Sequence, residues 1–268
     1  MKFKYYFVKD KNKYIKSLFK LSFVNEDIPF SSIIIPNGFP TFSYLFNEGQ
    51  TSFLGKKETK LHGFVVTGQC YGAYNYLVNN SGLTFGLELH PTALYKIFNT
   101  DISKFTDQHV TLNESNTDFE SKISEIFLKT KNDEKEFVRK ITLFLDNINP
   151  FIDNDVIQID KTINYIFEKQ GMLQINDLLK VVPFSQKSLE TKFKKIVGLT
   201  PGKYVRLIRF SNLMRKYESN KIDLNDLILM YNYYDKSHFL KDFKLFLNQS
   251  PKEFFKTEYP LLKIYLKN

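Results

Sequence analysis

The hydrophobic and polar positions of residues 233–256 repeat with the period of an α-helix. At about 100° per residue, the apolar side chains fall on one arc, which holds Phe239, Phe243, Phe246 and Leu247. The opposite arc holds Ser237, His238, Lys241 and Lys244. The pattern predicts a helix that buries one face and offers a polar, cationic face to an anionic partner.

The same pattern occurs 50 residues earlier, where the apolar arc holds Leu189, Phe193, Ile196 and Val197. Gly198 and Asn248 follow the two helices, and these residue types tolerate positive φ best. Ser185 and Asp235 are good N-caps, and a shorter apolar helix precedes each copy, at 175–182 and 224–231. A short helix, a tight turn and a second helix with a polar outer face form a helix-turn-helix unit.

One longer helix is expected between the two copies. Residues 201–217 contain no breaker after Gly202 and cover roughly 17 residues, or about 25 Å at 1.5 Å per residue. This length suits two recognition helices placed about one duplex turn, roughly 34 Å, apart. The two units are therefore predicted to reach successive major-groove segments, with recognition helices near 186–197 and 236–247.

The N-terminal part has a different pattern. Residues 28–90 read as strands rich in β-branched and aromatic residues, separated by Asn/Gly turns. They predict an antiparallel sheet or small barrel, followed by a short helix near 90–98 and two helices within 118–148. These two helices could pack on their own sheet or on a second subunit, and we favour their own sheet. The predicted class is α+β, with an N-terminal β-rich domain with flanking helices at 1–154 and an all-α domain at 155–268, each with its own core.

Charge is concentrated in the C-terminal part. Residues 1–158 contain 18 Lys and Arg and 18 Asp and Glu, whereas residues 159–268 contain 20 and 11, so the whole net charge of +9 lies there. A basic domain beside a neutral one indicates nucleic acid or an anionic membrane surface as partner. Membrane binding is disfavoured because no long helix carries a continuous basic face.

Other compositional features narrow the class of protein. No run of about 18 apolar residues occurs, and lysines interrupt the start of the chain, so we expect a cytoplasmic protein without a membrane segment. Cys70 is the single cysteine, which excludes an internal disulfide and a multi-cysteine metal site. We interpret Cys70 as a small buried strand residue in preference to a redox sensor.

These motifs resemble the AraC-type transcriptional regulators over about residues 163–256. The first unit matches through Ser185, Leu189, Phe193, Gly198, Thr200-Pro201, Tyr204, Arg206 and Arg209. The second unit matches through Tyr233, Asp235, Ser237, Phe239, Phe243-Lys244 and Ser250-Pro251. Asn232 and Asn248 replace glycines of the family pattern, and Leu229 replaces a small alanine and is expected to alter helix packing slightly. The resemblance implies a double helix-turn-helix that binds double-stranded DNA, with RNA polymerase as a further partner.

Residues 33–49 and 83–114 resemble, less specifically, a β-rich sensor-like domain found ahead of this module in some family members. His90-Pro91-Thr92 stands where that domain often has a glycine. This resemblance implies binding of a small-molecule effector or formation of a homodimer.

Motif position assigns the site residues. The expected DNA-facing residues are Gln186, Lys187, Glu190, Thr191, Lys236, Ser237, His238 and Lys241, and the expected phosphate contacts are Lys194, Arg206 and Lys244. Arg206 and Arg209 suit an intradomain ion pair equally well. An effector pocket is considered for Phe42, Tyr44, Phe46, Phe64, Tyr74, Tyr76 and Phe85, with a plain aromatic core as the favoured alternative. A metal centre of His62, His90, His109 and Glu88 is disfavoured because no ligand spacing joins them.

No catalytic signature, cofactor motif or metal motif is present, so we expect neither an enzyme nor a cofactor. The sequence predicts a sequence-specific DNA-binding transcriptional regulator. Two alternatives remain: a small-molecule-binding sensor or enzyme whose helical domain serves oligomerisation, and a nonspecific architectural DNA binder.

Overall fold

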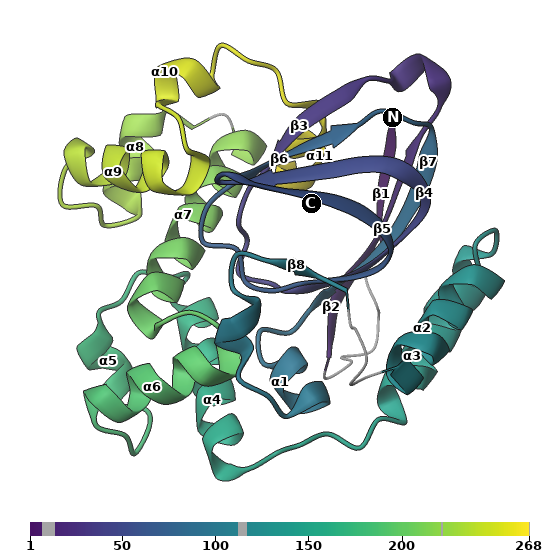
Figure 1. Cartoon of the computed structure of the whole chain (residues 1–268). Helices are drawn as coiled ribbons and strands as arrows, with labels where there is room; N and C mark the ends of the chain where they lie inside the picture. Colours follow the sequence, from purple (N-terminus) through teal and green to yellow (C-terminus); the bar gives the residue numbers. More distant parts are fainter. Residues whose placement is uncertain (7–13, 112–116, 221, 268) are drawn as a thin grey trace.

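The computed structural model describes residues 1–6, 14–111, 117–220 and 222–267. Strands build the N-terminal part and helices build the C-terminal part (Figure 1), which confirms the predicted α+β class. Residues 112–114, the end of the second sensor-like segment, lie outside the described ranges.

A strongly curved antiparallel sheet forms the N-terminal part (Figure 1). Its described strands are β1 (Lys2–Tyr6), β2 (Ile15–Phe23), β3 (Phe30–Ile34), β4 (Thr41–Leu54), β5 (Lys57–Thr67), β6 (Tyr74–Val78), β7 (Gly82–Leu89) and β8 (His109–Val110). The main path runs β1-β2-β7-β4-β5-β8, and β6 joins β3 to the second half of β4. The sequence prediction missed β1, β2 and β8. Lysines alternate with aromatic residues in β1, so its period-2 signal is present at Lys2–Tyr5 but its hydrophobicity is low.

Alternate residues of β4 point to opposite faces of the sheet. Phe42 and Tyr44 lie on the face that is covered by α2 (Thr117–Lys129) and α3 (Glu134–Asp146). Tyr44 stacks on Phe127 of α2 with ring centroids 5.4 Å apart, and Phe85 of β7 packs against Phe137 of α3 at 4.9 Å. The two helices therefore pack on their own sheet, as predicted.

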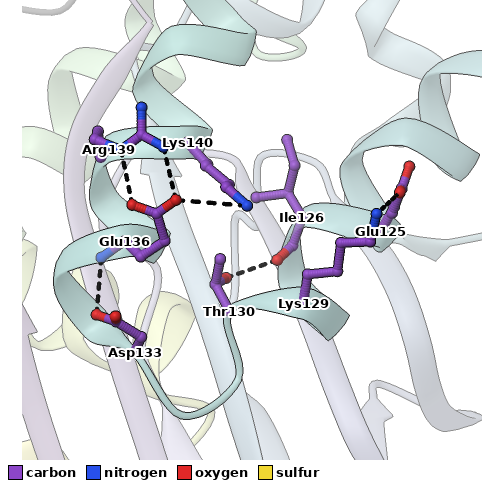
Figure 2. Close-up of polar contacts among 8 residues, drawn as sticks. All are labelled: Glu125, Ile126, Lys129, Thr130, Asp133, Glu136, Arg139 and Lys140. Carbon is purple, nitrogen blue, oxygen red and sulfur yellow. Dashed lines mark hydrogen bonds and ion pairs between the residues drawn. The ribbon is translucent and has the colours of Figure 1, made fainter.

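Capping and ion pairs hold the α2–α3 hairpin (Figure 2). Asp133 is the N-cap of α3 and accepts from the Glu136 backbone N–H at 3.0 Å. Thr130 donates from Oγ1 to the Ile126 carbonyl at 2.6 Å, which satisfies a carbonyl at the end of α2. Arg139 donates to both carboxylate oxygens of Glu136, at 2.7 and 2.6 Å. These exposed pairs add little stability, so the buried aromatic face fixes the position of the hairpin.

Helices follow the sheet. They are α1 (Ala93–Phe98), α4 (Asn154–Glu168), α5 (Ile175–Leu179), α6 (Gln186–Val197), α7 (Pro201–Asn220), α8 (Leu224–Met230), α9 (Lys236–Leu247), α10 (Pro251–Phe254) and α11 (Pro260–Lys267), with short 3-10 turns η1 (Asn25–Asp27) and η2 (Ile102–Phe105). Ser185 and Asp235 cap α6 and α9, accepting from backbone N–H groups three residues later at 3.3 and 2.8 Å. Gly198 and Asn248 adopt φ of 100° and 57°. The predicted caps are therefore confirmed.

The two parts of the chain share a core. One cluster of buried side chains continues from the sheet, at Phe42 and Leu87, into the helices, at Phe193 and Tyr204. Tyr204 of α7 donates to the Gly38 carbonyl in the β3–β4 loop at 3.0 Å. A Cβ on Gly38 would lie 2.6 Å from Ile208 Cδ1, so the loop and α7 touch closely. The expectation of a separate core for each domain is wrong.

The last helix also crosses the predicted boundary. α11 packs beside β3 and α7 (Figure 1), and Leu261 joins a second cluster with Leu21, Leu45 and Val65 of the sheet. The boundary near residue 154 therefore separates two sequence patterns, while α11 packs against the β-rich part.

Candidate nucleic-acid interface

Helices α6 and α9 are each fixed by an apolar stripe. In α6, Leu189, Phe193, Ile196 and Val197 are buried, and in α9 Phe239, Phe243, Phe246 and Leu247 are buried. Phe210 of α7 lies 6.3 Å from Phe239 and 5.0 Å from Phe246, between ring centroids. The buried stripes orient both helices, so their opposite faces point outward.

All eight residues expected to face DNA are exposed, on α6 and α9. Four of them, Lys187, Lys236, Ser237 and Lys241, make no side-chain hydrogen bond to any described residue. Lys194 and Lys244 are exposed on the same two helices. The two outer faces thus present free lysines without an acidic cluster to neutralise them, an arrangement suited to phosphate.

The remaining polar residues of these faces have local partners. Gln186 donates from Nε2 to Glu190 at 3.0 Å, and Thr191 Oγ1 donates to the Lys187 carbonyl at 2.9 Å. His238 Nδ1 lies 3.0 Å from the N-cap carboxylate of Asp235. Hydrogen bonds from the His238 backbone and ring lower the pKa of Asp235. A base contact by Gln186, Glu190 or His238 therefore requires the side chain to leave or share its present partner.

Arg206 forms an intradomain ion pair, one of the two roles predicted for it. Its Nε lies 3.2 Å from Oδ1 of Asp242 on α9, and its terminal guanidinium nitrogen donates to the same oxygen. Tyr233 donates to the other carboxylate oxygen, Oδ2 of Asp242, at 3.1 Å. Arg209 lies 3.7 Å from the same Oδ2 and stacks on the Tyr233 ring. Arg206 therefore links α7 to α9, and its phosphate contact stays a prediction.

Asp242 is a structural residue that was not predicted from the sequence. Its signal was present, because Asp242 follows Phe239 by three positions and precedes Phe243 and therefore lies on the buried arc of α9. A carboxylate on that arc needs cationic partners, and Arg206 and Arg209 supply them.

Leu229 departs from its expectation. It stands where the family has a small alanine and was expected to alter helix packing, but its side chain is 71% exposed at the end of α8. Its size therefore affects the surface beside the second unit and leaves the core unchanged.

A cavity lies on the other face of the sheet from α2 and α3. Its volume is about 160 Å³, and Leu261, Leu262 and Tyr265 of α11 contribute to its wall. Of the seven aromatic residues considered for a pocket, Tyr74 and Tyr76 line this cavity. The other five, Phe42, Tyr44, Phe46, Phe64 and Phe85, pack on the α2–α3 side. These five residues therefore form an aromatic core and do not line the cavity. The residues next to them in β4, β5 and β7 point to the opposite face of the sheet, where the cavity lies.

A partly buried polar network includes three residues of the cavity wall, Asn37, Glu88 and Tyr265. Glu88 of β7 accepts from Ser17 Oγ and from Asn37 Nδ2, each at 2.6 Å. Tyr265 of α11 accepts from Arg215 of α7 at 2.9 Å, and burial raises its pKa well above the ordinary value. Sequence spacing gave no sign of this network, because its members come from β2, β7, a loop, α7 and α11.

Cys70 and the histidines have separate surroundings. Cys70 follows β5 and is half-buried, so the prediction of a buried strand residue is wrong. Burial raises the pKa of its thiol to about 12, which disfavours the reactive thiolate. His109 lies between Ser52 Oγ and Thr67 Oγ1, at 2.8 and 2.9 Å, while His90 bonds Thr92 at 2.9 Å. Among the described residues, no three His, Cys, Asp or Glu side chains are placed to share a metal ion. The described helices also include none with the length and apolarity to cross a membrane.

Known proteins resemble the C-terminal part in sequence and the whole chain in fold. Residues 178–257 match the family model of a helix-turn-helix domain. The transcriptional activator AarP of Providencia stuartii is 28% identical over 79 residues, 30% of this chain and 58% of AarP. The probable transcription factor PqrA of Proteus vulgaris is 26% identical over 102 residues, 38% of this chain and 84% of PqrA.

The crystal structure of ToxT from Vibrio cholerae O395 covers 95% of this chain and 97% of its own, with a TM-score of 0.50 at 10% identity. At this identity the likeness shows the fold alone, an N-terminal β-rich part followed by helices. The matches to AarP and PqrA confirm the resemblance inferred from the motifs for the C-terminal part. Residues 178–257 thus form a helix-turn-helix domain of the kind found in AraC-type transcriptional regulators.

Proposed function

We propose that this protein is a transcriptional regulator that binds specific duplex DNA through α6 and α9. The observation that carries the proposal is the pair of outward faces, each fixed by a buried stripe and each bearing lysines without hydrogen-bond partners among the described residues. A recognition helix needs this division, because one face must pack on its partner helices and the other must enter the major groove.

The linking helix has a suitable length for two contacts. α7 contains 20 residues, which at 1.5 Å per residue is about 30 Å. One duplex turn measures about 34 Å, so the two units reach successive major-groove segments on one side of the duplex. In this proposal Lys187, Lys194, Lys241 and Lys244 contact phosphates, and Ser237 and Lys236 lie closest to base edges.

Duplex binding by fluorescence anisotropy tests the proposal. The probes are duplexes selected by the protein from a random pool, with scrambled duplexes of the same composition as control. The variant Lys187→Ala/Lys241→Ala removes one free lysine from each recognition helix. We expect it to weaken binding and to lower the slope of log affinity against log salt by about two.

A matched control is Lys131→Ala/Lys135→Ala, which removes two lysines from the α2–α3 hairpin, and this hairpin lies far from α6 and α9 (Figure 1). It should leave affinity and salt slope unchanged. Equal affinity for all duplexes would favour a nonspecific DNA binder, and binding that ignores the Lys187/Lys241 change would refute the assigned faces.

We also propose that the cavity under α11 binds a small-molecule effector. A cavity of about 150 Å³ with apolar walls accommodates benzene, so 160 Å³ fits a ligand about the size of one ring, with a polar group directed at Glu88 and Asn37. Thermal shift with a panel of single-ring compounds tests this. Ser43 lines the cavity from β4, and Ser43→Phe should fill it and abolish any stabilisation by the ligand.

A homodimer formed through the α2–α3 hairpin is a further part of the proposal. Leu128 of α2 and Leu143 of α3 are 55% and 49% exposed, and this face would be covered in such a dimer. Sedimentation of the wild type beside Leu128→Lys/Leu143→Lys tests it, and a dimer that survives the change would exclude this face.

A further inference from the structure

Both recognition helices end against the N-terminal part of the chain. Each ends at a residue in the left-handed conformation, Gly198 after α6 and Asn248 after α9. The contacts made there involve residues 68–73, which follow β5, and residues 105–108, which precede β8. We call these two stretches the bridging segments.

The end of α9 is held by three contacts to the first bridging segment. Asn248 donates from Nδ2 to the Ala73 carbonyl at 2.8 Å, and the Ala73 N–H donates to the Phe246 carbonyl at 2.9 Å. Tyr71 packs edge-on against the Phe246 ring, with centroids 5.3 Å apart. The backbone of residue 73 thus has both its donor and its acceptor bound to the last turn of α9.

The end of α6 is held by the second bridging segment. Thr106 donates from Oγ1 to the Gly198 carbonyl at 2.6 Å. The fit is close, since a Cβ on Gly198 would lie 2.9 Å from Thr106 Oγ1. The carbonyl at the C-cap of α6 therefore has a partner from outside its own domain.

The two bridging segments are bonded to each other. Gly68 donates to the Gln108 carbonyl at 3.2 Å, and Asp107 donates to the Gln69 carbonyl at 2.9 Å. The Asp107 carboxylate also accepts from the Tyr71 N–H at 2.7 Å. Hydrogen bonds and short stretches of main chain therefore connect the end of α6, through the N-terminal part, to the end of α9. This connection is additional to the covalent link through α7.

We propose that the bridging segments set the position of the two recognition helices relative to each other, and that Asn248 is the positioning residue for α9. The inference rests on the proposed DNA-binding function. Glycine, the family residue at position 248, would allow the same backbone conformation but has no amide to donate. The bridging segments contact the C-terminal ends of α6 and α9, and the expected DNA-facing residues stay exposed. The contact thus prearranges the helices for DNA instead of covering them, which lowers the cost of ordering on binding.

Asn248→Gly in the full chain tests the inference. It keeps a residue that accepts positive φ and removes only the side-chain hydrogen bond to Ala73. Asn232→Gly is the matched control, because Asn232 also has positive φ (55°), also stands at a family glycine, and makes no side-chain hydrogen bond to a described residue. The probes are a duplex selected by the wild type and the same duplex with one base pair inserted between its two half-sites.

We expect Asn248→Gly to bind the selected duplex about fivefold more weakly, the loss of one hydrogen bond. On the lengthened duplex, the loss of affinity relative to the wild type should be smaller. The ratio of the affinities for the selected and the lengthened duplex should therefore be lower for Asn248→Gly than for the wild type. Thr106→Val, which removes the hydrogen bond to the end of α6, should lower the same affinity ratio. Asn232→Gly should match the wild type on both duplexes.

An equal loss on both duplexes would indicate local damage to the second unit and overturn the inference. Wild-type behaviour of Asn248→Gly, or tighter binding by it, would overturn the inference as well. A wild type without preference for any duplex would instead refute the proposed function, so the two failures are distinguishable.

Discussion

Asp242 offers a direct test of how the second recognition helix is held. Its side chain is 3% exposed and faces Arg206, Arg209 and the Tyr233 hydroxyl. In Asp242→Ala the buried Tyr233 hydroxyl loses its acceptor, at a cost of about 1–3 kcal/mol. Breaking a fully buried ion pair costs about 3–5 kcal/mol, but Arg206 is 45% exposed and can turn to solvent. We therefore expect a loss of about 2–4 kcal/mol in the free energy of unfolding.

Urea unfolding followed by far-ultraviolet circular dichroism measures this loss. Asp242→Asn keeps the shape and one acceptor oxygen, so it should lose less than the alanine variant. Lys241→Ala is the neighbouring control: its side chain is exposed, so its stability should stay within about 0.5 kcal/mol of the wild type while its DNA affinity falls. If Asp242→Ala unfolds at the wild-type urea concentration, the ion pair does not hold α9 and the reasoning is refuted.

Three further predictions concern the rest of the fold. Burial lowers the pKa of His109 and His90 to about 4 from the ordinary value of 6.5. Because the unfolded chain takes up the protons first, the free energy of unfolding should fall as the pH is lowered from about 6.5 to 4. His109→Gln should make this fall shallower in urea unfolding, and an unchanged fall would mean that His109 is already protonated in the fold. Phe127→Ala removes a fully buried ring from the aromatic core and should cost about 3–5 kcal/mol in thermal or urea unfolding, whereas a loss below about 1 kcal/mol would mean that α2 is not packed on the sheet. Gly38→Ala forces a Cβ against Ile208 at a φ of +85° and should cost about 1–3 kcal/mol; an unchanged melting temperature would contradict the close contact of the β3–β4 loop with α7.

The C-terminal helices could be predicted closely because their signals are local. A helix repeats every 3.6 residues, so the stripes of α6 and α9 were visible in the sequence, and Ser185, Asp235, Gly198 and Asn248 marked the ends. The exposed faces could be predicted from the same period.

The N-terminal part was predicted less completely because its decisive contacts join distant residues. The period of two placed Phe42 and Tyr44 on one face of β4, but it could not show that α2 and α3 cover that face. The cavity could not be predicted, because part of its wall comes from α11, about 220 residues after β4 in the chain. Likewise Asn248 was understood as a substitute for glycine, whereas its bond to Ala73 depends on where the segment after β5 lies.

The first bridging segment connects the cavity to the recognition helices. Cys70 of this segment and Tyr74, the residue that follows the segment, line the cavity. Tyr71 and Ala73, which lie between them in the chain, contact the end of α9. Neighbouring residues of one short stretch thus face two different sites, so a shift of the backbone at residues 70–74 would change both the cavity and the contacts to Phe246 and Asn248. A ligand changes DNA binding only through its different affinity for two states of the protein. If the cavity binds an effector, as proposed above, the two states would differ in the position of residues 68–73, and a ligand that fits this cavity would favour the arrangement of α6 and α9 described here.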